Sequence, residues 1–151
     1  MTPSNKCVEL IKRFEWCKLN AYLDPIGIPT IGYGSIMWPD GKRVKLGQKI
    51  TLQQAEDMLK WEIDIKAKPV NSLLAKVAVN QNQFDALISF AYNLGIGALT
   101  RSTLLKKVIA NPCDASIRDE FNKWVNAGGK KLAGLVRRRK AEADLYFSKI
   151  L

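Results

Sequence analysis

The sequence contains no histidine among its 151 residues. This absence excludes Ser-His-Asp and Cys-His nucleophile systems and every histidine-ligated metal site. An enzyme built from this chain therefore needs Asp, Glu, Lys, Tyr or Cys as its acid and base. Cysteine is also scarce: Cys7, Cys17 and Cys113 form no C-x-x-C pair. We therefore expect free thiols in a reducing compartment, with no disulfide framework, metal or cofactor.

Long hydrophobic runs are missing as well. No stretch approaches 18 apolar residues, and the first 16 residues lack the apolar segment of a signal peptide. We therefore expect a chain that is made in the cytoplasm of the cell that produces it, without an export signal of its own. Acidic residues are outnumbered, with 14 against 24 basic ones, and residues 101–151 alone carry 12 basic and five acidic side chains. Such a field favours a polyanionic partner, which could be nucleic acid, an anionic membrane or a cell-wall polymer.

The apolar pattern that is present predicts a mostly helical α+β protein. Helical spacing of apolar residues over 4–16 indicates an amphipathic helix. Turn signals around Pro25 and Pro39 separate short β-prone runs, which predict a small antiparallel hairpin or three-stranded sheet over about 20–47. We expect one domain over 1–151, with a β lobe at about 17–50 and helices over 1–16 and 51–151.

Capping signals divide the second part of the chain into helices. Thr51 opens a capping box, and we expect Pro69 to end the helix that follows. Asn80 opens another helix, which ends at Gly95. Later helices are expected after three further signals, namely Ser102 or Thr103, Asp114, and the Gly128-Gly129 pair.

Glu15 is the charged residue that falls inside the apolar arc of the first helix, between Ile11 and Phe14. These neighbours remove water from its carboxyl group, which suits a general acid, although a helix-end glutamate that reaches solvent is the alternative. Asp24 and Thr30 follow in the expected β lobe, and each alone is an ordinary turn-capping or strand-forming residue. Together, a helix-borne acid facing a strand-borne carboxylate and hydroxyl is the layout of an inverting glycosidase.

The residues around this acid resemble the signature of the phage-type lysozymes. The similarity begins with Phe14-Glu15, residues 19–24, Gly27 and residues 30–34, and it continues in residues 80–99, 102–107 and 124–147, so it covers nearly the whole chain. The resemblance implies a lysozyme-like fold with the cleft between a β lobe and a helical lobe.

The resemblance also implies roles for the three residues. Glu15 would be the general acid, Asp24 would hold and activate the attacking water, and Thr30 would help to position it. The reaction implied is hydrolysis of the β-1,4 bond between N-acetylmuramic acid and N-acetylglucosamine in peptidoglycan. The protein would then be an endolysin that reaches the wall after a separate protein has permeabilised the membrane.

Two positions depart from the family pattern. Trp16 stands where the family usually has glycine, and Ser35 stands where it usually has histidine. Trp16 brings the local backbone into question because glycine can take conformations that tryptophan cannot. A lytic transglycosylase, which uses one acid and closes the sugar on itself, is the nearest alternative in chemistry.

The last helix combines a basic run with an expected apolar stripe. Arg137, Arg138 and Lys140 form either a solvated face or a surface for an anionic envelope polymer, while Arg139 projects into the stripe and is expected to pair with a carboxylate. A membrane-disrupting tail is a further alternative. Nucleic-acid binding is not expected, because no recognition motif accompanies the basic residues. We expect a monomer. The stripe comprises Leu132, Leu135, Val136, Ala143, Tyr146, Phe147 and Ile150.

Overall fold

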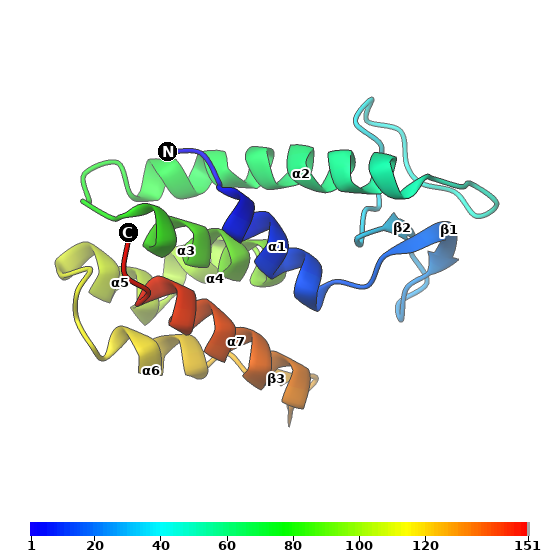
Figure 1. Ribbon diagram of the computed structural model, residues 1–151. Helices are drawn as coiled ribbons and strands as arrows, with labels where there is room; N and C mark the ends of the chain where they lie inside the picture. The colour runs from blue at the N-terminus through cyan, green and yellow to red at the C-terminus, as the bar shows by residue number, and fades with distance from the viewer. Residues whose placement is uncertain (151) are drawn as a thin grey trace.

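The computed structural model describes residues 1–150 and confirms the mostly helical α+β fold (Figure 1). Among residues 1–150 there are seven helices, and α3 contributes a continuously buried segment, residues 82–91, to the core. The elements are α1 (Asn5–Phe14), β1 (Lys18–Leu23), β2 (Pro29–Gly32), α2 (Leu52–Leu73), α3 (Gln81–Leu94), α4 (Ile96–Arg101), α5 (Thr103–Ala110), α6 (Ile117–Asn122), β3 (Asn126–Ala127), β4 (Lys130–Lys131) and α7 (Ala133–Tyr146).

The small β lobe lies beside the N-terminal end of α2, at a distance from α5 and α6 (Figure 1). Strands β1 and β2 pair antiparallel, with Tyr22 opposite Thr30. The rest of the lobe, up to Ile50, is held by isolated bridges such as those between Asn20 and Lys49 and between Ile31 and Ser35. The sequence pattern therefore located the hairpin correctly, and the region that follows is mostly loop.

Helix α2 does not end at Pro69, so this expectation was wrong. The helix continues to Leu73 because tertiary contacts hold its last turn. Val70 is fully buried, and the Asn71 side chain exchanges hydrogen bonds with the amino group and the carbonyl of Met1, at 2.8 and 2.7 Å. These contacts offset the single helical hydrogen bond that a proline removes.

The predicted caps of α2, α3 and α5 are confirmed. Thr51 and Asn80 each form a complete capping box, Ser102 caps α5, and Gly95 follows α3 with a positive φ of 90°. The prediction for α6 needs correction, because this helix starts after Ser116. The carboxylate of Asp114 accepts a hydrogen bond from the Ser116 N–H in the turn before the helix.

Two elements were not expected from the sequence. The short helix α4 lies between α3 and α5, and a hairpin of β3 and β4 precedes α7. Gly128 and Gly129 form its turn, both with positive φ (58° and 77°), as a two-residue turn of this handedness requires. None of the helices formed by residues 1–150 has the length and apolar character needed to cross a membrane.

The buried face of α7 differs from the expected apolar stripe. Its buried residues are Arg138, Arg139, Glu142, Ala143 and Tyr146. Leu132, which was placed in the stripe, is 43% exposed. Of the predicted stripe, Ala143 and Tyr146 are buried, whereas Ile150 at its end is 52% exposed. Charged residues that neutralise one another occupy much of the buried face.

Candidate active site

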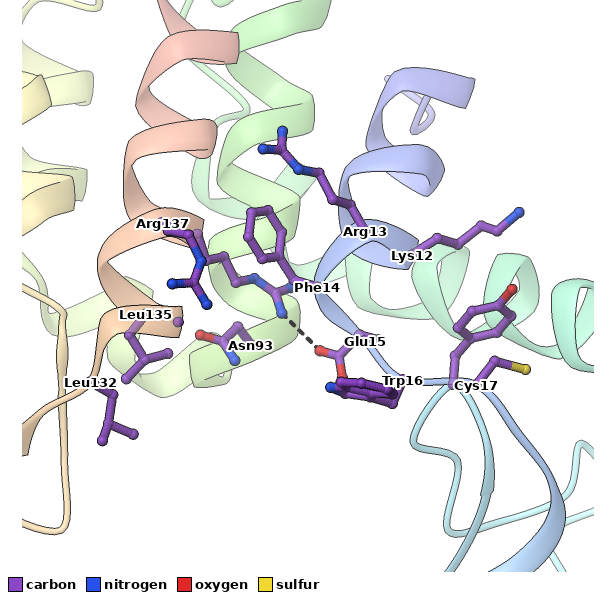
Figure 2. Close-up of a pocket in the computed structure, with 13 residues that line it drawn as sticks. Lys12, Arg13, Phe14, Glu15, Trp16, Cys17, Asn93, Leu132, Leu135 and Arg137 are labelled. Atoms are coloured by element: carbon purple, nitrogen blue, oxygen red, sulfur yellow. Dashed lines mark hydrogen bonds and ion pairs between the residues drawn. The ribbon is translucent and has the colours of Figure 1, made fainter.

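Glu15 lies directly after the last turn of α1, where its backbone N–H still donates to the Ile11 carbonyl at 3.0 Å. Two clefts, of about 850 and 590 Å³, meet at this residue. Both are lined by Glu15, Tyr33 and Asn93, so the β lobe and the helical part of the chain each contribute to the walls. Figure 2 shows the larger cleft, with the Glu15 carboxylate between α1 and the start of α7.

A buried arginine holds the Glu15 carboxylate. Nη1 of Arg138 lies 2.8 Å from Oε1 of Glu15, and the arginine side chain is only 3% exposed whereas that of Glu15 is 26% exposed. This contact joins two residues that are 123 positions apart in the sequence. It fixes the acid at one oxygen while leaving part of the carboxylate accessible from the clefts.

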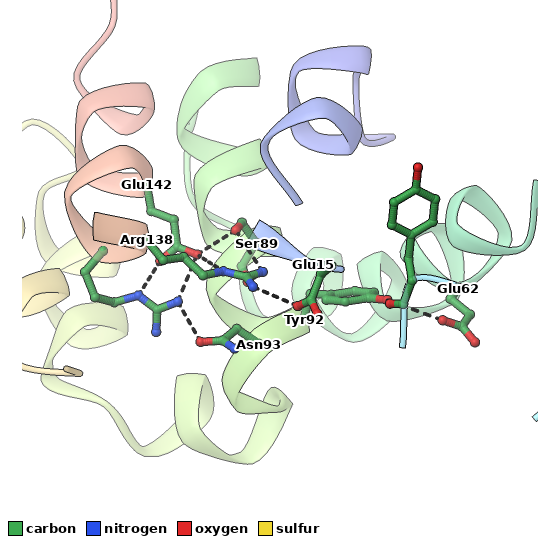
Figure 3. A network of polar contacts seen from close by, with 9 residues as sticks. Glu15, Glu62, Ser89, Tyr92, Asn93, Arg138 and Glu142 are labelled. Carbon is green, nitrogen blue, oxygen red and sulfur yellow. Dashed lines mark hydrogen bonds and ion pairs between the residues drawn. The ribbon is translucent and has the colours of Figure 1, made fainter. Parts of the chain in front are cut away.

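Behind this arginine lies a second, fully buried carboxylate, that of Glu142. Its oxygens lie 3.4 Å from Nε of Arg138 and 2.7 Å from Nε of Arg139, and the Ser89 hydroxyl donates to Oε2 at 2.5 Å. Arg139 also donates to the Asn93 side chain at 2.8 Å. Figure 3 shows the resulting chain of polar contacts, which runs from α7 through α3 to Glu15.

This network changes the interpretation of the basic run. The sequence predicted that Arg139 pairs with a carboxylate without indicating which one. That carboxylate is Glu142, so the prediction of a buried ion pair is confirmed. Arg138, in contrast, cannot belong to an envelope-binding surface because it is buried between two carboxylates. Arg137 is exposed, and Lys140 is exposed and pairs with Asp144 at 2.8 Å.

The smaller cleft contains further polar groups that sequence reasoning missed. The Tyr92 hydroxyl lies 3.4 Å from Oε2 of Glu62, and Nζ of Lys66 lies 4.2 Å from the centre of the Tyr92 ring. Burial raises the pKa of Glu62, although the Ser35 hydroxyl, Lys66 and Tyr92 oppose this rise. Ser35, the second departure from the family pattern, is thus a buried residue of the β lobe that contacts α2.

Asp24 and Thr30 lie in the β lobe, and both make local hydrogen bonds. Oδ1 of Asp24 accepts from the N–H groups of Ile26 and Ile28, at 2.9 and 2.8 Å, and the buried Thr30 hydroxyl donates to the Ile28 carbonyl at 2.9 Å. Neither side chain lines the two clefts. Tyr22 lies opposite Thr30 in the sheet, and burial first, then the charges of Glu15 and Asp24, raise its pKa.

Over residues 1–150 the structure brings no three carboxylate or thiol side chains together as metal ligands would be. The polar side chains that line the two clefts include two carboxylates, Glu15 and Glu62, the Arg138 that holds Glu15, the Asn93 amide and two tyrosines, Tyr33 and Tyr92. Such a site can bind a polar ligand and transfer a proton at the Glu15 carboxyl group.

A small β lobe, a helical lobe, and an acid at the helix end between them define a lysozyme-like protein. Residues 12–142 match the family model described as Phage lysozyme, and the chain belongs to this family. It is 36% identical to an endolysin of Salmonella phage P22 over 98% of this chain and 99% of that protein. It is 43% identical to an endolysin of Bacillus phage PZA over 98% of this chain, but spans only 56% of that relative's length.

Solved structures agree with this assignment. An endolysin from Escherichia coli O157:H7 phage FAHEc1 superposes with a TM-score of 0.88 at 42% identity, covering 99% of this chain and 96% of that one. A mutant of P22 lysozyme superposes with a TM-score of 0.85 at 34% identity, covering 98% and 99% of the two chains.

Proposed function

We propose that this protein is an endolysin that hydrolyses the β-1,4 bond between N-acetylmuramic acid and N-acetylglucosamine in bacterial peptidoglycan. The observation that carries the proposal is the position of Glu15, partly exposed at the junction of two clefts and held at one oxygen by Arg138. The names of the relatives, which are endolysins and a lysozyme, support the same class of reaction.

In this proposal Glu15 donates a proton to the leaving glycosidic oxygen. Arg138 occupies Oε1, and Oε2 lies on the side of Gly34, where the Cβ atom of any larger residue would come within 3.8 Å of it. In this proposal the proton that is transferred is therefore carried by Oε2. An inverting mechanism needs a second carboxylate to take a proton from water on the other face of the sugar.

Asp24 is proposed as that second carboxylate, with Thr30 beside it. Two backbone N–H groups bind Oδ1 of Asp24, so Oδ2 is the oxygen that accepts a proton from the water. The Thr30 hydroxyl donates its hydrogen to the Ile28 carbonyl, so it offers the water an acceptor. Bond cleavage then releases one sugar with a protonated leaving oxygen, and the water oxygen bonds to the anomeric carbon of the other.

Clearing of purified peptidoglycan by the Glu15→Gln and Asp24→Asn variants tests these roles. Each variant should lose at least about 10²-fold in rate, as expected when a positioned acid or base is removed. Glu9→Gln is the matched control, because Glu9 lies on α1, directly before Glu15 in the fold, and is exposed. Full activity in both site variants would refute the proposed mechanism.

A lytic transglycosylase is the second candidate, and one observation favours it. Asp24 and Thr30 do not line the clefts that contain Glu15, whereas a transglycosylase needs only one acid. Mass spectrometry of the released fragments separates the two reactions. Free reducing ends support hydrolysis, and anhydro ends would establish the transglycosylase.

The exposed basic residues of α7 are proposed to attract the anionic wall polymer. Arg137 and Lys140 remain available for this role, and Arg138 does not. Wall binding should weaken with increasing salt and in the Arg137→Glu/Lys140→Glu double variant. Binding that is unchanged in both experiments would exclude this surface.

The state and location of the protein before lysis are also part of the proposal. We propose a monomer that waits in the host cytoplasm until another protein permeabilises the membrane. Sedimentation of the purified protein tests the first statement, and fractionation of cells expressing it tests the second. Recovery in the membrane fraction would contradict the proposed location.

A further inference from the structure

Trp16 follows Glu15 directly and is the most exposed large apolar side chain among residues 1–150, at 83%. It lines the 850 Å³ cleft together with Glu15. A single exposed apolar residue needs no explanation, but an indole on the wall of a cleft, next to a carboxylate, has the surroundings of a ligand-binding residue.

The backbone at Trp16 needs no glycine. None of the non-glycine residues in the described part of the chain has a positive φ, so tryptophan occupies this position without the strain that the family's usual glycine suggested. What the substitution adds is an aromatic surface at the cleft, which a chain with glycine at this position would lack.

The cleft around Trp16 matches the two-sided chemistry of a sugar ring. Figure 2 shows the indole beside Glu15, with Leu132 and Leu135 further along the cleft. The Asn93 amide and the Arg137 guanidinium supply polar groups on the same cleft. A pyranose has an apolar face of C–H groups and an edge of hydroxyl and amide groups, so it fits an aromatic surface flanked by polar side chains.

We propose that Trp16 is a specificity-determining residue on which a sugar ring of the glycan strand, next to the bond that is cleaved, stacks with its C–H face. This inference rests on the proposed function, since it names a contact of the same substrate. Stacking contributes mainly to binding, so it lowers KM more than it raises kcat. The alternative is that the exposed indole binds a second copy of this chain, and the tests below distinguish this outcome from sugar stacking.

The kinetic test uses soluble, uncrosslinked glycan strands with the wild type and the Trp16→Gly and Trp16→Phe variants. We expect Trp16→Gly to raise KM roughly 5- to 20-fold, in the range that loss of one aromatic stacking contact causes, with kcat within about threefold. Trp16→Phe keeps an aromatic face and should recover most of the affinity. Ile109→Ala is the matched control, because Ile109 is 51% exposed on α5 and lines neither cleft.

A binding test separates this inference from the proposed function. In the Glu15→Gln background, binding of the same strands is measured by equilibrium dialysis with and without Trp16→Gly. If the wild type hydrolyses no wall, the proposed function fails, whereas weaker binding in the double variant still supports stacking. Unchanged KM and affinity in a folded Trp16→Gly protein would overturn the inference. It would also be overturned if the variant changed only the sedimentation of the protein, because the indole would then serve self-association.

Discussion

Removal of the buried Glu142 charge should destabilise the protein far more than removal of an exposed one. In the Glu142→Gln variant the volume and the contact with Ser89 are largely kept, but Arg139 loses its only carboxylate partner among residues 1–150. Arg138 keeps Glu15. An unpaired guanidinium is then left in the core, where a charge without a partner is costly.

The size of the effect follows from the burial of the pair. The side chains of Arg139 and Glu142 are both 0% exposed, and breaking such a pair costs about 3–5 kcal/mol. A domain of this size is stable by about 5–15 kcal/mol, so a large share of its free energy of unfolding would be lost. The melting temperature should fall by roughly 6–20 °C.

Urea unfolding followed by circular dichroism measures this loss, with Asp144→Asn as the control. Asp144 pairs with Lys140 and Arg118 on the surface, both at 2.8 Å, and such exposed pairs contribute at most about 1 kcal/mol. A Glu142→Gln variant that is no less stable than this control would refute the reasoning. The double variant Arg139→Met/Glu142→Leu should regain most of the stability, because apolar residues of similar size replace a buried pair without an unpaired charge.

Three further predictions concern other parts of the molecule. Hydrogen bonds from Lys123 and Lys107 lower the pKa of Glu120, so its contribution to stability is complete above the ordinary pKa of 4.5 and is lost as the pH falls below that value. In urea unfolding between pH 7 and 3, the free energy of unfolding should therefore decrease less for Glu120→Gln than for the wild type. Iodoacetamide should alkylate Cys17 in the cleft and slow wall clearing, while Cys7 stays unmodified because burial raises its pKa. Peptide mass spectrometry identifies the labelled cysteine, and full activity of protein labelled at Cys17 would contradict this prediction. Gly34→Ala should lower the free energy of unfolding in urea by about 1–2 kcal/mol, because Gly34 has a φ of 95° that alanine rarely adopts. Gly97→Ala, in helix α4, is the control, and an equal loss there would show that the positive φ is not the cause.

The parts of the fold that were predictable from sequence depend on local interactions. Capping boxes at Thr51 and Asn80 and the terminating Gly95 act within one helical turn, so their signals are complete in a few residues. Pro69 was misjudged because the contacts that carry α2 past it involve Met1 and the core, far away in sequence. Local propensity gave the wrong end of the helix where tertiary packing determined it.

The candidate site likewise depends both on local signals and on contacts between residues far apart in the sequence. The helical spacing put Glu15 inside the apolar arc of a helix over 4–16, whereas α1 ends at Phe14 and Glu15 has an extended backbone. Its partner Arg138 lies 123 residues away. No local pattern around Glu15 indicates that contact. Glu62 and Tyr92 were not predicted as site residues for a similar reason, because α2 and α3 bring them to the cleft from separate parts of the chain.

The basic run in α7 nevertheless contained usable information. Consecutive residues of an α-helix are about 100° apart, so four in a row cannot all face solvent when the helix is packed on one side. Helix α7 packs against α1, α3 and α6, which forces part of the run into the core. Glu142 lies four residues after Arg138 and three after Arg139, the spacings at which helical side chains meet. A basic run on a packed helix, with one acid at these two spacings, therefore indicates a buried charge network, and here that network holds the proposed catalytic acid.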